Sequence, residues 1–175
     1  MLPAQGRFAE ARSGVRQLHY SAVIDAPADA VWEAVGAFGS WGAWMPTIVA
    51  EEIEDGRPQD QVGCVRRLTT ETGAVARERL LALSQVERSF SYNVVSSPNY
   101  AMDDYVSTMR VVEITESPER CLVEWTCRFS AADEAAEDEI AAGLGARIYR
   151  GGLAALRAHF EAGNPKRGGD DDDPR

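Results

Sequence analysis

The chain has 175 residues, of which 45% are hydrophobic and 26% charged, and this composition is typical of a globular protein rather than a disordered one. Its net charge is −10 and Lys166 is its only lysine, so the sequence lacks the basic stripe of a protein that binds nucleic acid. A chain of this length fits one domain with short tails, and we predict no nucleic-acid partner.

The N-terminal residues 1–15 combine glycine, charged and small apolar residues, and we predict a flexible arm there. They contain no continuous apolar run of the roughly 7–15 residues that a signal peptide needs, so we expect neither secretion nor membrane insertion. The three cysteines, Cys64, Cys121 and Cys127, form no closely spaced pair. Their spacing favours buried free thiols in a reducing, cytoplasmic compartment.

The first predicted strand begins at Arg16, because apolar residues alternate along "RQLHYSAVID". A short helix follows in "APADAVWEAVGAF", where Pro27 suits the first turn and Asp29 favours the positive end of the helix dipole. The segment "GSWGAWMP" predicts a second short helix, which Ser40 caps and Pro46 ends.

Six further strands are predicted from extended runs that turn residues separate. The runs are "TIVAEEIEDG", "QVGCVRRLTTETG", "AVARERLLALSQ", "RSFSYNVVSS", "DYVSTMRVVEITES" and "RCLVEWTCRFS". Short connections between successive strands indicate hairpins, and hairpins imply an antiparallel sheet.

A long amphipathic helix is predicted from the cap Ser130 to the "GNP" at 163–165, and its apolar stripe requires it to cover one face of the sheet. Its glycines at 143, 145, 151 and 152 either allow a close approach to the sheet or leave room for a ligand. The chain therefore predicts an α+β domain over 16–163, followed by an acidic, disordered tail at 164–175.

The strand that contains "VARERLLAL" must turn either Glu78 or both Arg77 and Arg79 toward the interior. Hydrophobicity does not decide between the two faces, because both carry apolar residues. Burying two cations costs more than burying one carboxylate, so we favour Glu78 inside. Glu78 then either lines a functional cavity or forms an ion pair with Arg66 or Arg67 that serves structure alone.

Four segments carry a resemblance to a known family: "APADAVWEAVGAFGSWGAWMP", "VGCVRRLTTETGAVARERLLALSQVERSFSYNVVSSP", "YVSTMRVV" and "YRGGLAALRAHF". Over residues 17–162 the chain resembles the START-like, helix-grip (SRPBCC) superfamily, in its bacterial polyketide cyclase/dehydrase-like branch near the plant abscisic acid receptors. The resemblance implies a seven-stranded curved antiparallel sheet wrapped around the C-terminal helix, with two short helices after the first strand and a cavity for a small apolar ligand.

The resemblance also implies the residues that face this cavity. Glu78 in "ERL" matches an inward glutamate, and this match decides the orientation of its strand. Glu124 and Tyr105 match inward polar positions. The inward lysine of the receptors has no counterpart in "AWMPTIV", so a ligand carboxylate held in that way is not expected. The full set predicted to bind ligand is Trp44, Arg67, Glu78, Tyr92, Val94, Tyr100, Met102, Tyr105, Glu124, Thr126 and Tyr149.

Three functions are compatible with such a cavity. The first is a carrier or sensor for a small hydrophobic molecule of polyketide, isoprenoid or lipid-like type. The second is a polyketide cyclase or dehydratase in which Glu78 is the acid or base and Tyr105 stabilises an enolate. The third is a ligand-gated interaction module that uses the loops 69–73 and 97–103. We expect no metal and no cofactor, and the sheet edges leave a homodimer open.

Overall fold

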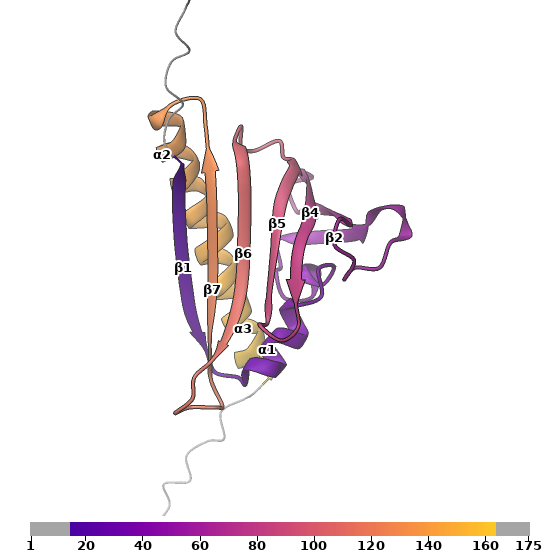
Figure 1. Ribbon diagram of the computed structural model, residues 1–175, viewed down its shortest axis with the longest axis vertical. Helices are drawn as coiled ribbons and strands as arrows, with labels where there is room; N and C mark the ends of the chain where they lie inside the picture. The colour runs from indigo at the N-terminus through magenta and orange to yellow at the C-terminus, as the bar shows by residue number, and fades with distance from the viewer. Residues whose placement is uncertain (1–14, 164–175) are drawn as a thin grey trace, which may run out of the picture.

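Figure 1 shows the computed structural model of the protein, which describes residues 15–163. The predicted arm at 1–15 lies outside the described residues except for Val15, and the predicted tail at 164–175 lies outside them entirely. The elements are β1 (Arg16–Ile24), α1 (Ala28–Val35), the 3₁₀ turns η1 (Trp41–Ala43) and η2 (Glu54–Gly56), β2 (Ile48–Ile53), β3 (Val65–Thr70), β4 (Val75–Ser84), β5 (Ser89–Ser96), β6 (Asp103–Glu113), β7 (Cys121–Ser130), α2 (Glu134–Gly143), the π-helical segment η3 (Leu144–Arg150) and α3 (Gly151–Gly163).

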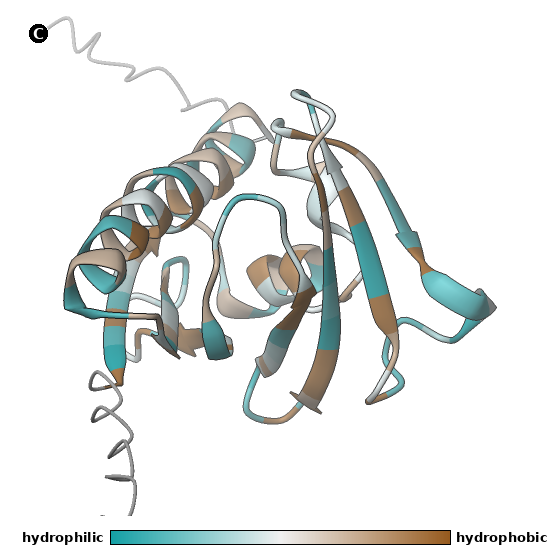
Figure 2. Cartoon of the chain, turned by 90° about the horizontal axis from the view of Figure 1, so that it is seen from above, coloured by the Kyte–Doolittle hydropathy of each residue, from teal (hydrophilic) through white to brown (hydrophobic). Residues whose placement is uncertain are grey.

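The seven strands form one antiparallel sheet in the order β1-β7-β6-β5-β4-β3-β2. Neighbouring strands are joined along the chain from β2 to β7, and β1 then pairs with β7. The predicted α+β helix-grip fold is therefore confirmed. In Figure 2, hydrophobic and hydrophilic residues alternate along the strands, as expected for a sheet with one buried face.

The segments after β1 form as predicted, with one difference. Pro27 precedes α1 and Asp29 lies in its first turn. The second short helix is a single 3₁₀ turn, and the Oγ of Ser40 donates to the carbonyls of Ala34 and Ala37 instead of capping it. This turn places Trp41 in the core.

The long helix runs without a break from α2 through η3 to α3, and Figure 1 shows it crossing behind β1, β7 and β6. Asp133 caps it, because its Oδ1 accepts the Ala136 N–H at 2.8 Å; the predicted cap at Ser130 is wrong. A methyl group on Gly152 would lie 2.7 Å from the Trp125 ring. A close approach to the sheet therefore requires glycine at this position.

Candidate ligand-binding cavity

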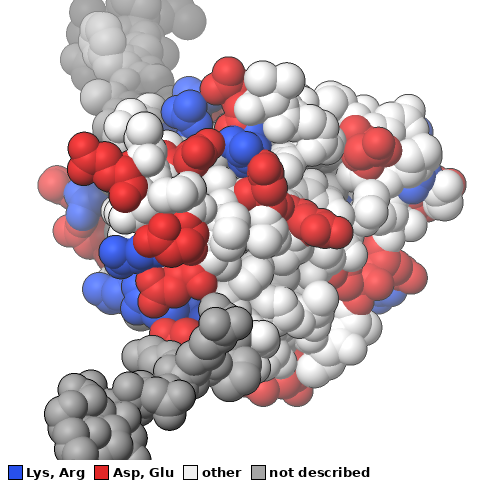
Figure 3. All heavy atoms as spheres, turned by 90° about the horizontal axis from the view of Figure 1, so that it is seen from below, with Lys and Arg blue, Asp and Glu red and all other residues white. Residues whose placement is uncertain are grey.

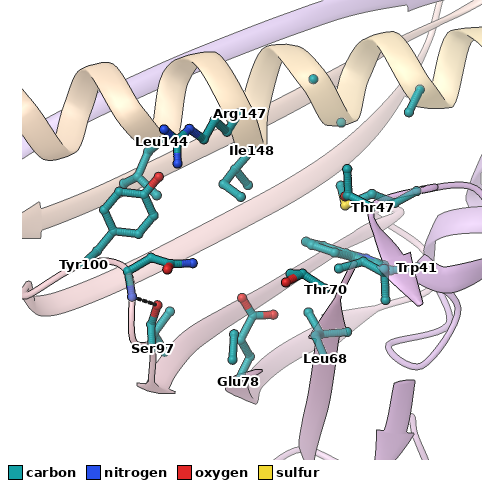
Figure 4. Close-up of a pocket in the computed structure, with 18 of the residues that line it drawn as sticks. Trp41, Thr47, Leu68, Thr70, Glu78, Ser97, Tyr100, Leu144, Arg147 and Ile148 are labelled. Atoms are coloured by element: carbon teal, nitrogen blue, oxygen red, sulfur yellow. Dashed lines mark hydrogen bonds between the residues drawn. The ribbon is translucent and has the colours of Figure 1, made fainter. Parts of the chain in front are cut away.

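A cavity of about 190 Å³ lies between the concave face of the sheet and the long helix (Figure 4). Its sheet wall comes from β2 to β6, and its other walls from η1 and the segment after it, the loop after β5, and the helix from Leu144 to Ala155. The lining residues are Trp41, Met45, Pro46, Thr47, Ile48, Leu68, Thr70, Ala76, Glu78, Val94, Ser97, Asn99, Tyr100, Met102, Tyr105, Leu144, Arg147, Ile148, Gly151, Gly152 and Ala155.

Glu78 is the acidic residue of this lining, and it also forms an ion pair. Arg66 lies directly opposite it on β3, and its Nε donates to Oε2 of Glu78 at 2.8 Å, while Nη2 lies 2.6 Å from the same oxygen. Oε1 of Glu78 accepts no hydrogen bond from residues 15–163, and Figure 4 shows the carboxylate directed into the cavity. The two alternatives for Glu78 are thus not exclusive, since the cavity wall contains the pair.

Aromatic rings and a carbonyl hold Arg66 in this position. Its side chain is wholly buried, and Cζ lies 3.7 Å from the centroid of the Trp41 ring and 4.1 Å from that of Phe38. Its Nη1 also donates to the Phe38 carbonyl at 3.0 Å. Cation–π contacts and the carboxylate together compensate the buried charge, so the orientation of Glu78 is fixed before any ligand arrives.

A second carboxylate, Glu51 on β2, lies near this pair. Its Oε2 accepts the Gly42 N–H at 3.0 Å, whereas Oε1 is buried and has no partner among the described residues. Burial raises the pKa of the Glu51 carboxyl, although the Gly42 hydrogen bond and the charge of Arg66 oppose this shift.

A buried chain of hydroxyl groups lies behind the Tyr105 side of the cavity. The Tyr105 and Tyr149 hydroxyls are 2.8 Å apart, and the Tyr149 hydroxyl is 3.3 Å from Ser107 Oγ. Trp125 Nε1 donates to the same Ser107 oxygen at 3.0 Å. Burial raises the pKa of both tyrosines, so their phenols are proton donors at neutral pH and not bases.

Five of the residues predicted to bind ligand line the cavity, namely Glu78, Val94, Tyr100, Met102 and Tyr105.

Three predicted residues are buried behind the cavity wall instead. Tyr149 is fully buried and stacks on Tyr20, with ring centroids 5.3 Å apart. Tyr92 packs against the edge of Trp41 at 5.8 Å, and Trp44 packs against Trp41 at 5.6 Å. Their prediction as lining residues is wrong, because aromatic packing places them one layer deeper.

The other three lie on the convex face of the sheet. On β7 the buried positions are Val123, Trp125 and Cys127, so Glu124 and Thr126 point away from the cavity.

Glu124 lies 3.3 Å from Nε2 of the exposed His19 on β1, outside the cavity. On β3, Arg67 likewise faces outward, where Nη1 pairs with Glu52 at 3.1 Å. The predicted inward orientation is wrong for these positions, because alternate residues of a strand face opposite sides.

Arg147 is the functional candidate that the sequence interpretation missed. It lies on η3, is exposed, and lines the cavity three residues after Leu144 and one before Ile148. This spacing places the three residues on one helical face, so the helical periodicity of the sequence could have predicted that Arg147 faces the cavity.

Two further features concern the described part of the chain as a whole. Between residues 15 and 163, no helix is long and apolar enough to cross a membrane, and no cluster of three or more His, Cys, Asp or Glu residues could hold a metal ion.

Cys64, Cys121 and Cys127 are buried free thiols, and burial raises the pKa of Cys121 to about 11. A thiol in this state is a poor nucleophile.

The comparison with protein families finds one matching model, described as polyketide cyclase/dehydrase and lipid transport, over residues 16–161. No curated protein matches the chain. A putative uncharacterized protein of Bacillus thuringiensis is 32% identical, with a TM-score of 0.71, over 83% of this chain and 98% of that one.

XoxI of Bacillus cereus is 31% identical, with a TM-score of 0.70, over 82% of this chain and 94% of that one. Norcoclaurine synthase of Thalictrum flavum, solved with dopamine and hydroxybenzaldehyde, is 17% identical, with a TM-score of 0.64 and 93% coverage of both chains. The likeness to this enzyme shows a shared fold alone.

Proposed function

The chain belongs to the polyketide cyclase/dehydrase and lipid transport family, and from that premise we propose that it binds a small, largely apolar molecule in the cavity under the long helix, as a carrier or sensor. The observation that carries the proposal is the cavity itself, whose mostly apolar walls surround the fixed carboxylate of Glu78. Such a combination of apolar surface and few oriented polar groups is typical of small-molecule sites.

The volume of the cavity favours a compact ligand. A protein cavity of about 150 Å³ accommodates benzene. At about 190 Å³, this cavity is suited to one ring with small substituents. Of the polyketide, isoprenoid and lipid-like classes, the proposal therefore favours a small ring compound over a long acyl chain.

Catalysis by a cyclase or dehydratase is the second candidate. It is favoured by one observation, that Glu78 and Tyr105 line the same cavity. In that case Oε1 of Glu78 would accept a proton from the carbon beside a ligand carbonyl, and Tyr105 would donate a hydrogen bond to the resulting enolate oxygen. Binding comes first because a carboxylate bound to Arg66 is an acceptor and not a general acid.

A ligand-gated interaction module remains a third proposal, because Ser97, Asn99, Tyr100 and Met102 bring the loop after β5 into contact with the cavity. The proposal also keeps a cytoplasmic location, in which buried thiols stay reduced, and a homodimer through the edge strands β1 and β2.

Isothermal titration calorimetry with para-propylphenol, a neutral ring compound with one hydroxyl group, tests binding in the cavity. We expect saturable binding to the wild-type protein and a loss of at least tenfold in Ala155→Trp, because Ala155 lines the cavity and the indole would fill it. Ala154→Trp is the matched control, since Ala154 is exposed on the same helix and does not line the cavity. Equal binding by the two variants would refute the proposal, and so would a wild-type protein that binds neither this compound nor its charged analogues.

Catalysis has a separate test. If Glu78→Gln retains affinity for a ketone-bearing ligand but loses turnover, measured as product by mass spectrometry, the cyclase candidate stands. If the wild-type protein converts no ketone-bearing ligand, that candidate fails and the binding proposal is unaffected.

A further inference from the structure

The cavity lining contains one acidic and one basic side chain, and they come from opposite walls. Glu78 extends from β4 of the sheet, whereas Arg147 extends from the π-helical segment of the long helix. Glu78 is only 8% exposed, while Arg147 is exposed and lies where the cavity meets solvent, as Asn99 and Thr47 do. The cavity therefore has a buried acidic end and an exposed basic end.

The two charges differ in how far the protein already satisfies them. Arg66 neutralises Glu78, which leaves Oε1 as an acceptor for a neutral donor such as a hydroxyl group. Arg147 forms no ion pair with any carboxylate of residues 15–163. A ligand that complements both groups would place an anion near Arg147 and a hydroxyl group near Glu78.

Tyr100 belongs to the same end of the cavity as Arg147. Figure 4 shows the Tyr100 hydroxyl and the Arg147 guanidinium extending toward one another. Burial raises the pKa of Tyr100, and the positive charge of Arg147 opposes the shift. At neutral pH the phenol remains a hydrogen-bond donor that can bind the same anion as the guanidinium.

We propose that the ligand is a small aromatic hydroxycarboxylate, whose carboxylate binds Arg147 and Tyr100 and whose hydroxyl group donates to Glu78. The aromatic ring then lies between Leu68 on the sheet and Ile148 on the helix. A carboxylate suits this position because its two oxygens match the planar fork of a guanidinium. This inference rests on the proposed function and adds the polarity and the charge of the ligand to it.

Isothermal titration of the full-length protein with matched compounds tests both ends of the ligand. The acids are para-hydroxybenzoate, para-hydroxyphenylacetate and para-hydroxyphenylpropionate, which differ in the spacing between hydroxyl and carboxylate. For the acid that binds best, we expect an affinity about fivefold above that of its neutral amide, a difference typical of an exposed ion pair. Removing the hydroxyl group should weaken binding about tenfold, because a hydrogen bond to a charged group is lost.

Substitution of Arg147 assigns the effect to this residue. Arg147→Gln should abolish the preference for the acid over its amide, because the acid loses the ion pair and therefore more affinity than the amide does. Arg150→Gln removes the same charge from the same helical segment, but Arg150 does not line the cavity, so the preference should persist. The preference should also fall when the salt concentration rises, because salt screens an exposed pair.

The outcomes separate this inference from the function on which it rests. If the amides and para-propylphenol bind but the acids bind no better, the carboxylate inference is refuted and the binding proposal stands. If Arg147→Gln and Arg150→Gln reduce the preference equally, the assignment to Arg147 is refuted. If neither the neutral compounds nor the acids bind, the proposed function itself fails.

Discussion

Removing one partner of the Arg66–Glu78 pair should destabilise the protein more than removing both. In Glu78→Gln the guanidinium of Arg66 stays wholly buried without a counter-charge, and such a change costs about 3–5 kcal/mol in a protein interior. The Phe38 carbonyl and the Trp41 ring still contact the guanidinium, and such cation–π contacts recover about 1–2 kcal/mol. We therefore expect Glu78→Gln to lower the free energy of unfolding by about 1–4 kcal/mol.

A double-mutant cycle with Arg66→Met measures the coupling between the two residues. The double variant carries neither charge, so it should be more stable than Glu78→Gln alone, with a coupling energy of about 2 kcal/mol or more. Urea unfolding followed by far-ultraviolet circular dichroism gives the required free energies.

The neighbouring pair of Arg67 and Glu52 provides the control cycle. It has an N–O distance of 3.1 Å but lies exposed on the convex face, so its coupling should be about 0.2–1 kcal/mol. If the Arg66 and Glu78 substitutions were additive, or coupled no more strongly than this exposed pair, the assigned role of the buried pair would be refuted.

Three further predictions concern single positions. Burial raises the pKa of Glu51 above its value in the unfolded chain, so its ionisation opposes folding as the pH rises through the folded pKa. Glu51→Gln should therefore stabilise the protein at pH 7, and urea titrations should show this gain shrinking toward pH 4.5. Gly152→Ala should lower the melting temperature, because its methyl group would overlap side chains in the core. Gly151→Ala should raise the melting temperature, because it removes a helical glycine at a position where a Cβ atom meets only ordinary contacts. Equal shifts in the two variants would contradict this reasoning. Glu124→Gln should leave the affinity for para-propylphenol unchanged, since Glu124 lies beside His19 on the convex face, and a weakened titration would place it back in the site.

The orientation of the strands could be predicted only where the right physical argument was applied. For "VARERLLAL", periodicity was ambiguous, and the cost of burying two arginines together with the family resemblance indicated that Glu78 faces inward, where the structure places it. The sequence did not show which residue compensates the buried carboxylate. The pairing of β3 with β4 shows it, because Arg66 lies directly opposite Glu78.

On β7 the resemblance misled the prediction although periodicity was sufficient. "CLVEWTCRFS" alternates clearly, with Val123, Trp125 and Cys127 on one face, and this pattern alone turns Glu124 outward. The fold was recoverable from the order of strands and helices, whereas the depth of individual aromatic residues was not. Depth depends on side-chain packing between segments that lie far apart in the sequence, as for Tyr149 against Tyr20.

The position of the charges within the cavity has a consequence for redesign. The buried end depends on Arg66 and Glu78, which the fold cannot lose singly without destabilisation, whereas Thr47, Asn99 and Arg147 at the exposed end contribute little to the core. Figure 3 shows that both acidic and basic side chains lie on one face of the molecule. Libraries that vary only those three exposed positions should therefore contain a larger fraction of folded variants with new ligand preferences than libraries that vary Arg66 and Glu78.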